Sequence, residues 1–162
     1  NVTEFRAAAG NPDDPTKPDG GTIAQTAKAI RALWPKIGAL ITVLEGGTWA
    51  QVSAGLAKGC PVDVFVLSGA LPLEHRYGYL KLHAVAAGVS DQLRLANPLA
   101  LPHSRWKPIT EAQLQAAAVA WPDAGIHAIV FPNAEEAFRT HPLYVPPLKW
   151  TILGAGIYEV KT

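Results

Sequence analysis

The chain has 162 residues, with 14 Lys and Arg against 13 Asp and Glu, a formal net charge of +1 and one cysteine. This length fits one domain that buries roughly two-thirds of the surface of its unfolded form. The small, scattered charge argues against nucleic acid and anionic membranes as partners, and the lone Cys60 excludes an intrachain disulfide framework. No apolar stretch approaches the ~20 residues of a membrane span, so we expect a soluble protein, in a compartment that the sequence leaves unknown.

Residues 1–21 are expected to form an extended N-terminal arm, followed by a single globular domain over residues 22–162. Residues 10–21 contain three prolines and three glycines and almost no apolar side chain, so they cannot fold on their own. We expect this arm to be held by its own domain or by a neighbouring chain. The chain begins at Asn1 and has no methionine, which suggests a processed product or a stretch that lacks its original start.

A helix is predicted to begin after Thr22 and to end near Pro35. Thr22 and Gln25 form a capping box, in which each side chain satisfies a backbone N–H at the start of the helix. Apolar residues then recur at helical spacing on one face: Ile23, Ala27, Ile30 and Trp34. We therefore expect Trp34 to pack in the core.

Residues 38–69 predict a strand, a helix and a second strand. The two apolar runs, residues 39–44 and 62–67, are short, rich in β-branched residues and bounded by Gly or Pro, which indicates buried strands. Between them, Thr48 can cap a helix that Gly59 ends. A crossover of this length predicts that the two strands pair in parallel, with helices on at least one face.

The rest of the chain predicts further helices and strands. Helices are expected over residues 72–89, after Thr110 and after Asn133; strands are expected over residues 91–95 and 125–131, and a closing hairpin over residues 149–153 and 157–160. Proline-rich connectors are expected at residues 97–108 and 141–148. The predicted fold is α/β or α+β, a single mixed sheet of about four or five strands covered by three or four helices.

Residues 54–64 carry a short motif in which Gly59 is followed by Asp63 inside an apolar run. The motif resembles the zinc-binding segment of the D-alanyl-D-alanine peptidase and hedgehog-type family, in which a histidine and the aspartate bind zinc. The resemblance covers about eleven residues, and Leu56 occupies the position of the ligand histidine. It implies a degenerate zinc-peptidase-like enzyme that has lost the hydrolysis of the family.

Three residues are candidates for catalysis in a hydrolase: Asp63, His103 and His127. Asp63 lies inside an apolar strand, where an unpaired carboxylate is costly and needs a partner or a cavity. His103 lies in a proline-bounded loop, and His127 in a predicted strand, where a structural role is the simpler interpretation. His75 and His83, two turns apart on the predicted helix, are separated by about 12 Å and are too far apart to bind one metal. We predict no metal site and no cofactor.

The sequence favours a non-enzymatic structural or interaction protein, a subunit of a homo-oligomer or of a larger particle such as a virus capsid. Aromatic residues in and beside the proline-rich connectors suit docking surfaces, and the anchor candidates are Trp106, Tyr144 and Trp150. The alternative is a hydrolase, or a degenerate zinc-peptidase-like enzyme, with its site near Asp63, His103 and His127. A third hypothesis is a small-ligand or carbohydrate-binding module that uses exposed tryptophans.

Overall fold

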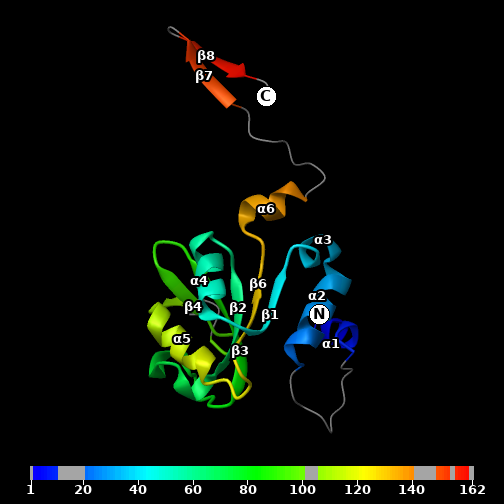
Figure 1. The fold of residues 1–162 in the computed structure, drawn as a ribbon, viewed down its shortest axis with the longest axis vertical. Coiled ribbons are helices and arrows are strands. Elements are labelled where there is room, and N and C mark those ends of the chain that lie inside the picture. Colours follow the sequence, from blue (N-terminus) through cyan, green and yellow to red (C-terminus); the bar gives the residue numbers. More distant parts are fainter. Residues whose placement is uncertain (1, 11–20, 101–105, 141–148, 154–155, 161–162) are drawn as a thin grey trace.

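The computed structural model describes residues 2–10, 21–100, 106–140, 149–153 and 156–160, and Figure 1 shows how the elements are arranged. The fold is α+β. Within these residues the helices are α1 (Val2–Ala8), α2 (Ile23–Leu33), α3 (Pro35–Gly38), α4 (Trp49–Ala57), α5 (Glu111–Val119) and α6 (Ala134–Arg139). The strands are β1 (Thr42–Gly47), β2 (Val62–Leu67), β3 (Leu82–Val89), β4 (Leu93–Ala96), β5 (Trp106–Pro108), β6 (Ile126–Val130), β7 (Lys149–Leu153) and β8 (Gly156–Val160).

Capping boxes begin four of the helices, and all four starts were predicted. The capping residues are Thr22 of α2, Thr48 of α4, Thr110 of α5 and Asn133 of α6. In the boxes of α2, α5 and α6 the N-cap side chain and the Gln or Glu three residues later bond to one another's backbone N–H, and in α4 the Gln51 side chain accepts the Thr48 N–H. Local sequence therefore sets where these helices begin.

Six strands form one sheet in the order β1-β6-β2-β3-β4-β5, and every neighbouring pair is antiparallel. The predicted parallel pairing of β1 with β2 is wrong, because β6 lies between them and pairs with both. The α4 crossover thus skips one position in the sheet, and a strand from much later in the chain fills it. The sheet also has more strands than the four or five expected, and the described residues contain more helices than the three or four expected.

The predicted helix over residues 72–89 is wrong. A 3₁₀ turn covers Leu73–His75, Tyr77 and Gly78 adopt positive φ angles of 49° and 75°, and β3 follows. The alanines of residues 82–89 favour a helix by local propensity, but pairing with both β2 and β4 makes this segment a central strand.

Helices cover the two faces of the sheet unequally. On one face, α4 and α5 pack over a core cluster that draws residues from β1, β2, β3, β4 and β6 and includes Ile109 just after β5. On the other face, α2 packs with Ile23, Ala27 and Ile30 on Phe65 and Ile129, and Ala84 is the one described residue of β3 to β5 that packs against this second cluster. The second face therefore lacks helix cover over β3, β4 and β5 in the described part of the chain (Figure 1).

The two ends of the chain differ in how they relate to this sheet. In the predicted arm, α1 lies beside α2, and the ring centroid of Phe5 is 6.3 Å from that of Trp34. Trp34 itself is 53% exposed, so its predicted place in the core is wrong. At the other end, β7 and β8 pair as the predicted antiparallel hairpin and form a two-stranded sheet of their own.

No helix in the described residues is long and apolar enough to cross a bilayer.

Candidate functional site

The register of the sheet places Asp63 and Trp106, two of the predicted site residues, in one row across the uncovered face. Asp63 of β2 pairs with Ala86 of β3, Ala86 pairs with Ala96 of β4, and Ala96 pairs with Trp106 of β5. Directly paired residues project from the same face. Three strand spacings separate the ends of this row, roughly 14 Å at about 4.8 Å each.

We call the surface around this row the open face. Its members lie on β3, β4 and β5 and are Leu82, Ala84, Ala86, Gly88, Arg94, Ala96, Trp106 and Pro108. Its centre holds three alanines and Gly88, of which Ala96 is buried, and Arg94, ion-paired with Asp91, lies beside Gly88 in the register. Trp106 and Leu82 are 50% and 41% exposed. The open face thus combines small apolar side chains with the Arg94–Asp91 ion pair, and it has Leu82 and Trp106 at its borders.

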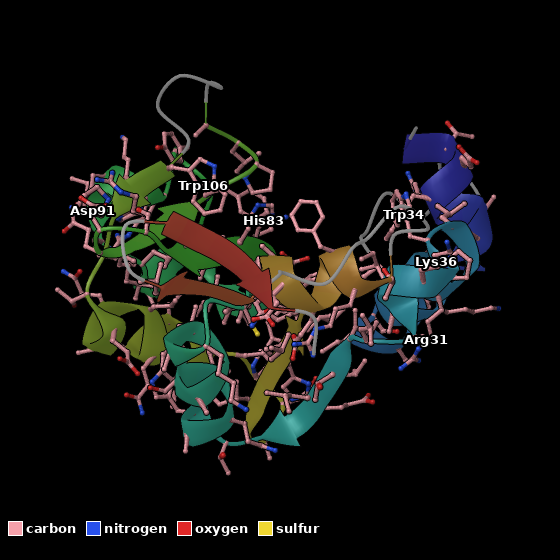
Figure 2. All side chains as sticks on the ribbon, turned by 90° about the horizontal axis from the view of Figure 1, so that it is seen from above. Arg31, Trp34, Lys36, His83, Asp91 and Trp106 are labelled. Atoms are coloured by element: carbon pink, nitrogen blue, oxygen red, sulfur yellow. The ribbon has the colours of Figure 1, made fainter. Side chains whose placement is uncertain are left out.

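Trp106 is held in place by its neighbours on the sheet. A Cβ atom on Gly88 would lie 3.8 Å from Cζ3 of the Trp106 ring, so the ring edge rests over this glycine. Arg94 donates from Nη1 to the Trp106 carbonyl at 3.4 Å and from Nε to Asp91 at 3.1 Å. Hydrogen bonds from Arg94 and Ser90 lower the pKa of Asp91 to about 2. Figure 2 shows Trp106 on the β3–β5 half of the molecule and Trp34 on the helices across from it.

Asp63 lies at the inner border of the open face, between Ile129 of β6 and Ala86 of β3. Its side chain is half-buried, and burial raises the pKa of its carboxyl group to about 6. The sequence predicts a partner or a cavity for this carboxylate. Instead, the raised pKa lets Asp63 take up a proton more readily than an ordinary aspartate. Near neutral pH the group remains mostly a carboxylate next to apolar surface.

His127 lies on the same face as Asp63 but takes part in packing. It belongs to β6, two residues before Ile129, and is 7% exposed. Its Nε2 atom is 3.3 Å from the Ala124 carbonyl, and its ring centroid is 6.0 Å from that of Trp121. Among the described residues no hydrogen bond or ion pair joins His127 to Asp63. These contacts are those of a structural histidine.

Sequence reasoning missed a buried polar cluster around Asn97, at one end of β3 and β4. Asn97 donates from Nδ2 to the His75 carbonyl at 3.0 Å, and its Oδ1 accepts the Leu99 N–H at 2.9 Å and lies 3.2 Å from His83 Nε2. The His75 ring lies 3.0 Å from the Pro108 carbonyl. Burial lowers the pKa of His83. The cluster links the 3₁₀ turn to β4 and β5. Sequence reasoning missed it because residues 72–89 were predicted to form one helix.

A cavity of about 330 Å³ lies between β1, α4 and the start of α6. Cys60 lines it, and burial raises the pKa of the Cys60 thiol, which leaves little thiolate at neutral pH. Gln51 and Glu136 also line it, but their side chains accept the N–H groups of Thr48 and Asn133 in capping boxes. These two polar side chains of the cavity therefore serve helix starts.

The remaining predicted site residues fall outside what the structure describes. His103 and Tyr144 lie outside the described residues, and Trp150 is described only by its place in β7. Of the predicted catalytic set, the structure therefore places Asp63 and His127. Of the predicted anchors, it places Trp106 with its side chain.

Comparison with known protein families, with curated proteins and with solved structures gives no match to this chain. The resemblance to the zinc peptidase family is therefore weak and consistent with chance. Leu56, at the position of the ligand histidine, is buried in the first core cluster. Among the described residues no group of three or more His, Cys, Asp or Glu is placed to hold a metal ion.

Proposed function

We propose that this chain is a non-catalytic interaction protein, a subunit of a larger assembly that docks another protein surface on the open face. The observation that carries the proposal is the unequal cover of the sheet: one core cluster spans the sheet, whereas the other stops at Ala84. Contiguous apolar surface left open to water marks interaction sites in soluble proteins. Trp106 is its main anchor candidate, since tryptophan is enriched among the residues that carry binding energy.

The small floor of the open face supports protein rather than small-molecule binding. Alanine and glycine let a partner backbone approach closely, and the cavity of about 330 Å³, the concave kind of site that small molecules usually occupy, lies elsewhere, between β1, α4 and α6. The proposed assembly is a homo-oligomer or a larger particle, of which a virus capsid is one kind. In either case the partner brings apolar side chains that fill the space between Leu82 and Trp106.

The proposal is tested by size-exclusion chromatography with light scattering on the full chain. We expect the wild-type chain to run above the monomer mass at high concentration and Trp106→Glu to return it to the monomer. Trp34→Glu is the matched control, because Trp34 is equally exposed but lies at the junction of α2 and α3. A monomer at every concentration, or equal effects of the two variants, would contradict the proposal.

A hydrolase remains the second candidate, favoured by one observation: the pKa of Asp63 near 6 suits a general acid or base. A hydrolase would lose activity on Asp63→Asn while keeping its fold. The proposed interaction protein would keep its oligomeric state in the same variant at pH 7.

A further inference from the structure

The helices α1, α2 and α3 concentrate positive charge. They contain four basic residues, Arg6, Lys28, Arg31 and Lys36, and one acidic residue, Glu4, which gives a net charge of +3. The whole chain has a formal net charge of only +1. Sequence reasoning argued against nucleic acid as a partner because the charges are scattered along the chain, but the fold gathers several of them on these helices.

We call the surface formed by Lys28, Arg31, Trp34 and Lys36 the basic patch. Lys28 and Arg31 are three residues apart in α2, so they lie on one side of that helix. Gly38 of α3 packs against Arg31, because a Cβ atom on Gly38 would lie 2.5 Å from the Arg31 Cα atom. Figure 2 shows Arg31, Trp34 and Lys36 together at α2 and α3, on the opposite side of the molecule from Trp106. The basic patch is therefore separate from the open face.

The positive charge of the basic patch is available to a partner. Lys28, Arg31 and Lys36 are exposed. Among the described residues, no hydrogen bond or ion pair joins their side-chain nitrogens to an acidic group. Three unneutralised cations on one surface favour an anionic ligand.

Trp34 adds a flat aromatic ring to these cations. Its side chain is 53% exposed, the only large hydrophobic side chain that α1, α2 and α3 expose in the described part of the chain. The Phe5 ring of α1 lies beside it, with the two ring planes tilted by 36°, and supports it from one side. An exposed aromatic ring next to cations is the combination that binds single-stranded nucleic acid, because bases stack on the ring while phosphates pair with the cations.

We propose that the basic patch binds single-stranded nucleic acid, with a base stacked on Trp34 and neighbouring phosphates paired with Lys28, Arg31 and Lys36. An acidic peptide would use the cations but would leave the flat ring without a matching group. An anionic membrane favours a helix that turns a broad apolar face outward, whereas α2 turns its apolar face, which includes Ile23 and Ile30, onto the sheet.

Fluorescence anisotropy with a labelled oligo(dT) or oligo(U) of about eight nucleotides tests this inference on the full chain. Three neutralised phosphates predict that the logarithm of the binding constant falls with the logarithm of the salt concentration with a slope of about −2. Trp34→Ala should weaken binding roughly tenfold through lost stacking. Its matched control is Trp106→Ala, at an equally exposed tryptophan outside the basic patch, and this variant should bind like the wild type.

The charge variants test the other half of the contact. Arg31→Gln combined with Lys36→Gln should reduce the salt slope to about −0.7, because one cation remains. Lys81→Gln, an exposed lysine outside the basic patch, should leave the slope unchanged.

Four outcomes would overturn the inference. These are the absence of oligonucleotide binding by the wild type, and binding that Trp34→Ala leaves unchanged. Equal affinity for a poly-glutamate peptide would assign the basic patch to acidic proteins, and binding to phosphatidylserine vesicles in place of oligonucleotides would assign it to membranes. The proposed function fails separately, because Trp106→Glu is expected to lose the oligomer and keep oligonucleotide binding.

Discussion

Asp63 shows at the scale of one residue how the open face affects stability. Its carboxyl group lies between apolar neighbours on β3 and β6, and burial raises its pKa to about 6. In the unfolded chain the pKa is about 3.9. The folded protein therefore binds more protons than the unfolded chain between about pH 4 and pH 6, and its stability falls as the pH rises through this window.

We predict that Asp63→Asn stabilises the protein at pH 7. The shift corresponds to at most about 3 kcal/mol, and the partial exposure of the side chain reduces the expected gain to about 1–2 kcal/mol. The gain should vanish near pH 3, below the pKa of both states, where the aspartate is largely protonated in the folded and the unfolded chain. Urea unfolding at several pH values measures it.

Glu45→Gln is the control for this prediction, because Glu45 is an exposed carboxylate on β1. It should leave the pH dependence of the unfolding free energy nearly unchanged. A loss of stability at pH 7 in Asp63→Asn would mean that the carboxylate has a favourable partner in the folded protein.

At the same scale, sequence reasoning identified Asp63 and Trp106 but not their shared row. An acidic residue in an apolar strand and a tryptophan in a proline-rich connector are visible in the sequence. That they lie on one face depends on the register of β2, β3, β4 and β5, and β3 was expected to be a helix. Asn97 was missed for the same reason.

At the scale of elements, two glycines in close contact hold the end of β1 against the residue that precedes β6. Gly125 has φ of 80°, and a Cβ atom there would lie 2.6 Å from the carbonyl carbon of Gly46. Gly46 has φ of 79° and lies within the irregular register between Glu45 and Gly47. A side chain at residue 125 thus meets both an unfavourable backbone conformation and backbone atoms that cannot move aside.

We predict that Gly125→Ala destabilises the protein by roughly 3 kcal/mol or more, because strain and overpacking add. Gly59→Ala is the matched control: Gly59 has φ of 74°, but nothing lies within 4 Å of its added Cβ. That variant should lose only about 1 kcal/mol from backbone strain. Thermal or urea unfolding of both variants measures the difference, and equal losses would contradict the role given to the Gly46 contact.

Element boundaries were predictable where local chemistry sets them. The starts of the four capped helices and the strands β2, β6, β7 and β8 follow from capping residues, turn residues and apolar runs, whereas β1 runs from Thr42 to Gly47, about three residues later than the apolar run at 39–44 predicts, and β4 begins two residues after the predicted start at 91. The order of the strands did not follow, because β6 enters between β1 and β2 from more than 60 positions along the chain. Residues 82–89 became a strand through pairing on both sides, which local propensity does not record.

At the scale of the whole molecule, the unequal cover of the sheet is the feature on which the proposed function depends. The face under α4 and α5 has a core that extends from β1 to β4, whereas the face under α2 is covered over β1, β6 and β2. Composition alone predicted a single domain with a sizeable core. It gave no indication that half of one sheet face lacks helix cover among the described residues.

Hydroxyl-radical footprinting of the wild-type chain tests this account most directly, because the chain carries its own control. Trp106 and Trp34 are 50% and 53% exposed, so in the dilute monomer their oxidation rates should be similar. As the concentration rises, we predict that oxidation of Trp106 slows several-fold while that of Trp34 does not change. Equal rates at all concentrations would contradict the claim that the open face is a docking surface.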